Sequence, residues 1–300
     1  MGSPLPYNRG VPPTQRPRLL GLDLDGTVID STNAIHPPTR DALHACHEAG
    51  IGLCFLTGRR PLTAGPLLDG IGLPAFVATN SGCLRWEYPA WRQIGRRMFP
   101  AALVGRIVEL TAPYSVNFYL DGSKTGIEFI QLERESTPET TQHLARFPGE
   151  RRIVRKVTDL AGLEVTQVAL PAAPEITKQL RDRVQAELDG AVLALSVRWP
   201  LMPTMALEVF HPLATKGDAL RSFAERLRIP QGAVVAVGDD VNDLSMLEWA
   251  GWSAAMPHSL AEVQAAADEV LDCPGRADGS PDDPAHALTP FLMRLLALPC

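Results

Sequence analysis

Acidic residues stand in pairs at the ends of two apolar segments of this 300-residue chain. Asp23 and Asp25 end the run LLGLDLD, and Asp239 and Asp240 end the run AVVAVGDD. Carboxylates that converge in one small cleft raise each other's pKa values or destabilise the fold unless a cation lies between them. Carboxylate, carbonyl and water ligands suit Mg²⁺, which also takes substrate phosphate oxygens. The expected ligands of this Mg²⁺ are Asp23, Asp25, Asp239 and Asp243.

The spacing of Asp23 and Asp25 predicts that the two carboxylates have different chemical roles. Side chains two positions apart on a strand point to the same face, so both carboxylates can flank one reacting atom. One can attack a phosphorus atom and form an acyl phosphate, while the other protonates the departing oxygen and later deprotonates the incoming water. This route divides one difficult displacement into two easier ones.

Three other residues could supply what phosphoryl transfer needs besides a nucleophile, namely positioning and neutralised charge at the phosphoryl oxygens. Thr57 can donate through its hydroxyl, Gly58 leaves backbone N–H groups approachable, and Lys216 supplies a cation. An isolated Thr-Gly pair is ordinarily a turn, and an isolated lysine is ordinarily an exposed charge. However, only four of the 28 basic residues are lysines, and a compact ammonium suits a single phosphoryl oxygen.

Asn80 and Asn242 are further candidates for contact with a substrate or its phosphate. Asn80 ends the apolar segment AFVAT, and Asn242 follows the second acidic pair. Asparagine also favours turns and helix caps, so either residue could instead have a purely structural role.

The candidate residues stand at the ends of apolar segments or just beyond them, and the segments themselves indicate buried strands. Residues 18–26, 51–58, 75–80 and 232–240 are near-continuous in apolar side chains, as in strands buried on both faces. Helical patterns such as residues 37–50 lie between them, which predicts a parallel sheet with right-handed crossovers. Because the carboxyl ends of such strands line the ligand crevice, we expect the candidate residues to converge there.

The middle of the chain has a different pattern. Strand-like segments outnumber helical ones in residues 84–204, which indicates an α+β module on a mixed or antiparallel sheet. We therefore predict a core of residues 18–83 and 205–300 that is split by an inserted domain, residues 84–204. The start, residues 1–17, is rich in proline and arginine, and it is interpreted as a flexible arm rather than a signal peptide.

The composition restricts the partners and the compartment. A net charge of −6 argues against a nucleic-acid or anionic-membrane partner, which would favour a basic surface. No apolar run approaches the roughly 18 residues that are needed to span a bilayer. The five cysteines form no CxxC pair, so we expect free thiols in a reducing cytoplasm rather than disulfides or a zinc site.

The segments that carry the candidate residues, taken in their order along the chain, resemble the motifs of haloacid dehalogenase (HAD) superfamily phosphatases. The resemblance is to the Cof-like branch with a large C2-type cap. The resemblance in the core covers roughly residues 18–82 and 207–279. It begins with DLDGT at residues 23–27, which implies that Asp23 is the nucleophile and Asp25 the general acid and base.

The second and third motifs of the family follow. LTGR at residues 56–59 implies that Thr57 binds the phosphoryl group, and Arg59 is left outside the catalytic set. TKGDAL at residues 215–220 implies that Lys216 is the cation of the site.

The fourth motif, GDDVNDLSML at residues 238–247, implies that Asp239 is a metal ligand and that Asp243 completes or supports the metal shell. TNSG at residues 79–82 resembles the Asn-Gly turn that faces the substrate in this branch. The sequence departs from the family where AMPHS, with His258, replaces an AMGN-like stretch, which predicts a different loop shape there.

The resemblance and the residues together predict an α/β fold with a Rossmann-like parallel-sheet HAD core and an inserted α+β cap. The expected function is Mg²⁺-dependent hydrolysis of a small phosphorylated metabolite, with sugar phosphates as the leading class, through an aspartyl-phosphate. A phosphomutase on the same core and a catalytically silent metabolite-binding or regulatory protein are the alternatives. The site residues that would be lost in a silent protein are intact, which argues against that alternative: Asp23, Asp25, Lys216 and Asp239. No oligomeric state is predicted.

Overall fold

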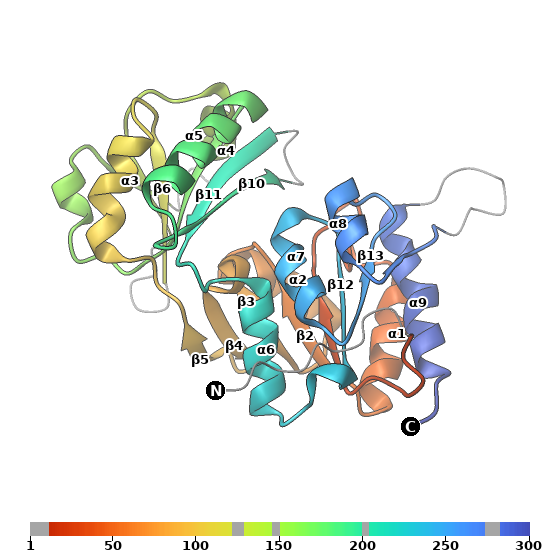
Figure 1. Cartoon of the computed structure of the whole chain (residues 1–300). Coiled ribbons are helices and arrows are strands. Elements are labelled where there is room, and N and C mark those ends of the chain that lie inside the picture. The colour runs from red at the N-terminus through yellow and green to blue at the C-terminus, as the bar shows by residue number, and fades with distance from the viewer. Residues whose placement is uncertain (1–11, 122–128, 146–150, 200–203, 274–282) are drawn as a thin grey trace. The chain divides into compact units, whose positions relative to one another are not determined.

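The computed structural model describes residues 12–121, 129–145, 151–199, 204–273 and 283–300 (Figure 1). Residues 1–11 of the predicted N-terminal arm lie outside the described residues. The chain divides into two compact units. The core unit comprises Met1–Ile94 and Thr215–Cys300, and the inserted unit comprises Gly95–Ala214. Among the described residues, no helix has the length and apolar character that crossing a membrane requires.

The core unit is built on an eight-stranded sheet that is parallel across most of its width. Its strands, in spatial order, are β14 (Glu269–Val270), β13 (Trp252–Ala255), β12 (Val234–Gly238), β1 (Leu19–Leu22), β2 (Gly52–Leu56), β3 (Ala75–Thr79), β4 (Leu84–Tyr88) and β5 (Arg92–Arg96). Neighbours from β14 to β3 pair in parallel, and β4 is antiparallel to β3. All residues of β1 and β12 are buried, which explains why their sequences are apolar without alternation.

Helices cover this sheet and bury their apolar sides against it. They are α1 (Pro37–Glu48), α2 (Pro61–Ile71), α6 (Lys216–Arg226), α7 (Leu244–Trp249), α8 (Ala261–Ala266) and α9 (Leu288–Leu296), with short 3₁₀ helices η1 (Asn80–Gly82), η4 (Gln231–Ala233), η5 (Val241–Asp243) and η6 (Pro284–Ala287). One apolar cluster joins α6 and α7 to β1, β2 and β12. Helices α1 and α9 pack against each other (Figure 1).

The inserted unit has its own sheet and its own apolar cluster. Its strands, in spatial order, are β10 (Leu193–Trp199), β11 (Thr204–Phe210), β9 (Val165–Ala172), β6 (Val116–Leu120), β7 (Phe129–Leu132) and β8 (Arg151–Val154). Its helices are α3 (Val104–Leu110), α4 (Pro138–Ala145) and α5 (Pro174–Glu187), with 3₁₀ helices η2 (Ala101–Leu103) and η3 (Val157–Leu160). Strands β7 and β8 pair in parallel and the other neighbours are antiparallel. An α/β parallel-sheet core interrupted by an α+β module confirms the predicted fold class.

The boundaries between the units differ from the predicted ones at residues 84 and 204. Strand β4 pairs with β3 of the core sheet from Ala75 opposite Tyr88 to Thr79 opposite Leu84, because only residues 80–83 separate the two strands. Strand β11 pairs with β9 and β10 and therefore belongs to the inserted sheet. Residue patterns indicate that a strand forms, but its partners depend on the chain connections.

Helices α6 and α7 approach each other closely at Gly217. The Gly217 N–H donates to Ser245 Oγ at 3.0 Å, and a Cβ at position 217 would overlap the carbonyl oxygen of Ser245. The glycine therefore lets the first turn of α6, which carries Lys216, pack directly on α7.

We predict that Gly217→Ala lowers the free energy of unfolding by about 1–3 kcal/mol, because the added methyl group must push the two helices apart. Alanine is the better helix former, so a helix-propensity effect would have the opposite sign. Gly105→Ala in α3 is the matched control, since a Cβ there meets no atom within 4 Å. Urea unfolding of both variants measures the difference, and equal stabilities would contradict the close-packing explanation.

Candidate active site

The candidate residues lie at the carboxyl ends of adjacent parallel strands of the core unit. Asp23 follows β1, Thr57 follows β2, Asn80 follows β3 and Asp239 follows β12. Backbone bonds continue the ladder to these residues: the Asp23 N–H donates to Val237 O at 3.0 Å and the Thr57 N–H to Ala78 O at 2.9 Å. The backbone positions of Asp23 and Thr57 are therefore fixed by the hydrogen bonds of the sheet.

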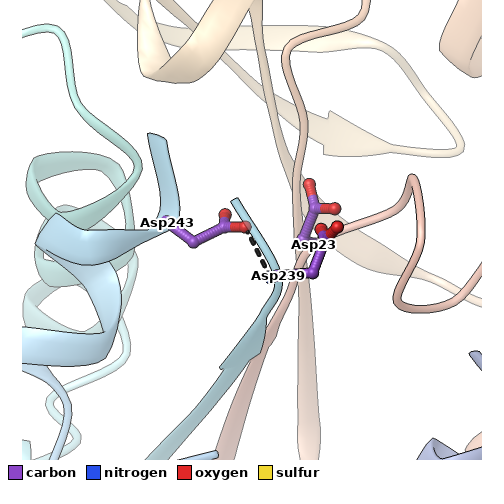
Figure 2. A group of neighbouring side chains, drawn as sticks. All are labelled: Asp23, Asp239 and Asp243. Carbon is purple, nitrogen blue, oxygen red and sulfur yellow. Dashed lines mark hydrogen bonds between the residues drawn. The ribbon is translucent and has the colours of Figure 1, made fainter. Parts of the chain in front are cut away.

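Three buried carboxylates form one group at this edge (Figure 2). Asp23, Asp239 and Asp243 each place one oxygen within 4.8 Å of the others. Asp243 lies in η5, and its Oδ2 accepts the backbone N–H groups of Asp239 and Asp240 at 2.9 and 3.0 Å. These two bonds fold the loop after β12 so that Asp243 points back toward the strand end that carries Asp239.

The ammonium of Lys216 lies between two of these carboxylates. Its Nζ is 2.5 Å from Asp23 Oδ1 and 2.6 Å from Asp243 Oδ1, and only 1% of its side chain is exposed. Burial would lower the pKa of Lys216, but the charges of Asp23 and Asp243 outweigh burial and raise this pKa above its ordinary value. The lysine is therefore a permanent cation within the acidic group.

One ammonium does not balance three carboxylates. Burial is the largest effect on Asp23 and raises its pKa; Lys216 lowers it, and the neighbouring carboxylates of Asp243 and Asp239 raise it further. Burial likewise raises the pKa of Asp243, against the opposite effect of Lys216. The group therefore has both the oxygen ligands and the excess negative charge that a hard divalent cation requires.

Asp25, which was expected among the metal ligands, is not one of the three members of this acidic group. Its carboxylate instead pairs with Arg59, whose Nε lies 3.0 Å from Oδ1 and 2.8 Å from Oδ2 and whose Nη2 also contacts Oδ1. The same Nη2 donates to Asn33 Oδ1 at 2.6 Å. The guanidinium fork sets the orientation of the Asp25 carboxylate, so Arg59 belongs to the site. Its place directly after Thr57 and Gly58 was the signal available in the sequence.

The loop after β2 and the turn after β3 are joined by backbone bonds. The Asn80 N–H donates to Arg59 O at 2.8 Å, and the Ser81 N–H donates to Thr57 O at 2.9 Å. The Thr57 hydroxyl is buried and accepts the Arg59 N–H at 3.0 Å. These bonds place Thr57 and Asn80 side by side at the sheet edge.

Gly58 also lies close to the side chains of Ser81 and Asn242. A Cβ at Gly58 would stand 3.6 Å from Ser81 Oγ and 3.7 Å from Asn242 Nδ2. Ser81 is buried and has a left-handed backbone (φ 56°). Ser81 could not be identified from the sequence, because serine in a turn carries no distinguishing signal.

We predict that Lys216→Met lowers the free energy of unfolding by about 3–5 kcal/mol, because Asp23 and Asp243 would stay buried without their cation. Lys178→Met is the control: Lys178 pairs with Asp182 on an exposed helix surface, and such pairs contribute about 0–1 kcal/mol. Urea unfolding in buffer free of divalent ions measures both variants. A Lys216 variant no less stable than the control would show that the buried pairs do not stabilise the core unit.

Known proteins are similar to this chain over most of its length. A family model described as haloacid dehalogenase-like hydrolase matches residues 20–279. The HMP-PP phosphatase of Cronobacter sakazakii is 29% identical over 254 residues, which cover 82% of this chain and 88% of that protein.

Two solved structures share the fold. A haloacid dehalogenase-like hydrolase from Bacteroides thetaiotaomicron aligns with a TM-score of 0.73 at 20% identity, covering 93% of this chain and all (100%) of that one. A sugar phosphatase of HAD subclass IIB aligns with a TM-score of 0.66 at 21% identity, covering 85% of this chain and 93% of that one. The chain therefore belongs to the haloacid dehalogenase-like hydrolase family, as a Cof-like phosphatase, and the resemblance found in its motifs is confirmed.

Proposed function

We propose that this protein is a Mg²⁺-dependent hydrolase of small phosphoric monoesters that acts through an aspartyl-phosphate on Asp23. The observation that carries the proposal is the buried group of Asp23, Asp239 and Asp243 around Lys216. Asp25 and Arg59 lie beside it. These residues would supply a nucleophile, a separate acid and base, and a cation at one edge of the sheet.

The acidic group fits Mg²⁺ by its chemistry. Asp23, Asp239 and Asp243 would hold the ion, since their carboxylates are buried, mutually close and only partly balanced by Lys216. When bound, the ion supplies positive charge near the phosphoryl oxygens. Asp25 is not assigned as a ligand here, because its carboxylate is engaged by Arg59.

In the first proposed step, a carboxylate oxygen of Asp23 attacks phosphorus in line with the ester bond. The P–O bond of the ester breaks, and protonated Asp25 gives its proton to the departing oxygen. In the second step, Asp25 takes a proton from water, and the resulting hydroxide attacks phosphorus and releases phosphate from Asp23. Thr57 and the backbone at Gly58 provide donors for phosphoryl oxygens, and Lys216 stays beside the nucleophile.

The proposed substrate is a small phosphorylated metabolite, and sugar phosphates are the leading class. A curated relative named as an HMP-PP phosphatase and a structural neighbour described as a sugar phosphatase support this size class. Every chemical group above belongs to the core unit, which leaves the inserted unit, Gly95–Ala214, for selection among esters. The five free cysteines suit a reducing cytoplasm as the working compartment.

The full chain is expected to release inorganic phosphate from members of a phosphorylated-metabolite panel in Mg²⁺, with sugar phosphates among the best. Excess chelator should abolish the release, and added Mg²⁺ should restore it. Full turnover in chelator would contradict the metal assignment. Transfer of phosphate to a second hydroxyl of the sugar, without release, would favour the phosphomutase alternative.

Substitution of the two aspartates is expected to separate their roles. Asp23→Asn should remove covalent labelling by a ³²P-labelled aryl phosphate, because no nucleophile remains. Asp25→Asn should slow turnover by about 10²–10⁴-fold yet accumulate labelled protein, because a good leaving group needs little protonation whereas water still needs its base. Asp41→Asn, an exposed acid of α1, is the control with normal turnover. Equal absence of label in both active-site variants would show that the roles are assigned wrongly.

A further inference from the structure

The loop after β13 places a histidine against one of the proposed metal ligands. His258 Nε2 lies 3.1 Å from Asp239 Oδ2. The carboxylate is largely buried, with 10% of the Asp239 side chain exposed, and the imidazole is about one-quarter exposed, at 28%. His258 stands in the AMPHS stretch where the sequence departs from the family, so the departure introduces a side chain that touches Asp239.

The position of His258 is set by its backbone. Gln264 Nε2, from α8, donates to Pro257 O at 3.2 Å and to Ser259 O at 3.1 Å, the carbonyls on either side of the histidine. The Met256 N–H donates to Gly238 O at 3.1 Å. The loop is thus tied both to α8 and to the end of β12, the strand that Asp239 follows.

Gly26 of the DLDGT motif lies directly over the contact between His258 and Asp239. A Cβ at position 26 would stand 2.8 Å from Asp239 Oδ2 and 2.9 Å from His258 Nε2, and the backbone there is left-handed (φ 79°). Both the space and the backbone conformation therefore require glycine. The motif that carries Asp23 and Asp25 also leaves room for the His258–Asp239 pair.

We propose that His258 is a positioning residue that donates its Nε2–H to Asp239 and holds this carboxylate in the orientation that binds the divalent cation. The inference rests on the Mg²⁺ site of the proposed function. An ionised carboxylate accepts about four hydrogen bonds or metal bonds through its two oxygens, so the bond to His258 and a metal bond are compatible. Partners that orient a metal ligand ordinarily contribute about 10–100-fold in metal affinity.

The two ring nitrogens of His258 differ in their contacts. Among the described residues, the buried Nδ1 of His258 has no hydrogen-bond partner. The ring is therefore engaged through Nε2 alone, and glutamine, whose Nε2 can reach a similar point, should replace it in part. A residue without a donor should not.

The test measures Mg²⁺ binding by titration calorimetry on the full chain at constant pH and without substrate. His258→Ala is expected to raise the Kd for Mg²⁺ by about 10–100-fold, and His258→Gln should recover most of the loss. Gln264→Ala, which loosens the loop but keeps the imidazole, should weaken binding by a smaller factor. Ser259→Ala is the matched control with unchanged affinity, since the Ser259 hydroxyl has no partner among the described residues.

The outcomes separate this inference from the proposed function. If the unaltered protein binds no Mg²⁺, the metal assignment itself is wrong. If it binds Mg²⁺ and His258→Ala binds equally well or more tightly, the role of His258 is overturned. A glutamine variant as weak as the alanine variant also overturns it, because the donated hydrogen bond would then not matter. Melting temperatures in chelator should be alike for the unaltered protein, His258→Gln and Ser259→Ala. If His258→Ala does not fold, His258→Gln and Gln264→Ala decide the same question.

Discussion

The burial of Asp23, Asp239 and Asp243 within one small group is the arrangement that the rest of the core unit must support. Removing each ionised carboxylate from water costs several kcal/mol, and their mutual repulsion adds to this cost. The ammonium of Lys216 offsets part of it for two of the carboxylates. Backbone N–H groups of Asp239 and Asp240 offset another part for Asp243. The remaining imbalance of negative charge is what the proposed divalent cation would offset.

Helix α6 delivers the compensating charge because of how it begins and what it packs on. Thr215 caps the helix by accepting the Asp218 N–H at 3.0 Å, so Lys216 is the first helical residue and projects toward the strand ends. The contact of Gly217 with Ser245 brings α6 onto α7, the helix that follows Asp243. Lys216 and Asp243 therefore meet although 27 positions separate them. The packing of Gly217 on Ser245 thus supports the ion pair between Lys216 and Asp243.

The proposed chemistry and the proposed selection of substrate belong to different units, each with an independent apolar cluster. The acidic group and its cation are carried by residues at the ends of β1 and β12, by η5 and by α6, all of which belong to the core unit. Within the core unit, Arg59 makes contacts through both its backbone and its side chain. Its backbone N–H and carbonyl bind Thr57 and Asn80, while its guanidinium orients Asp25. One residue thereby joins the loop after β2 to Asp25, the proposed acid and base.

The sequence by itself determined four strands of the parallel sheet, β1, β2, β3 and β12, and the residues at their ends. Strands buried on both faces must be apolar throughout, so a carboxylate or hydroxyl that follows such a run is conspicuous, as Asp23, Thr57 and Asp239 are. Only the tertiary structure decided that β4 pairs in the core sheet and β11 in the inserted sheet. It also decided that the carboxylate of Asp25 pairs with Arg59 and that His258 contacts Asp239. The physical reason is that these contacts join segments that are distant in the sequence. Arg59 and Asp25 are 34 positions apart, and His258 and Asp239 are 19 positions apart. Local periodicity carries no information about such distances, which are set when the sheet and its helices pack.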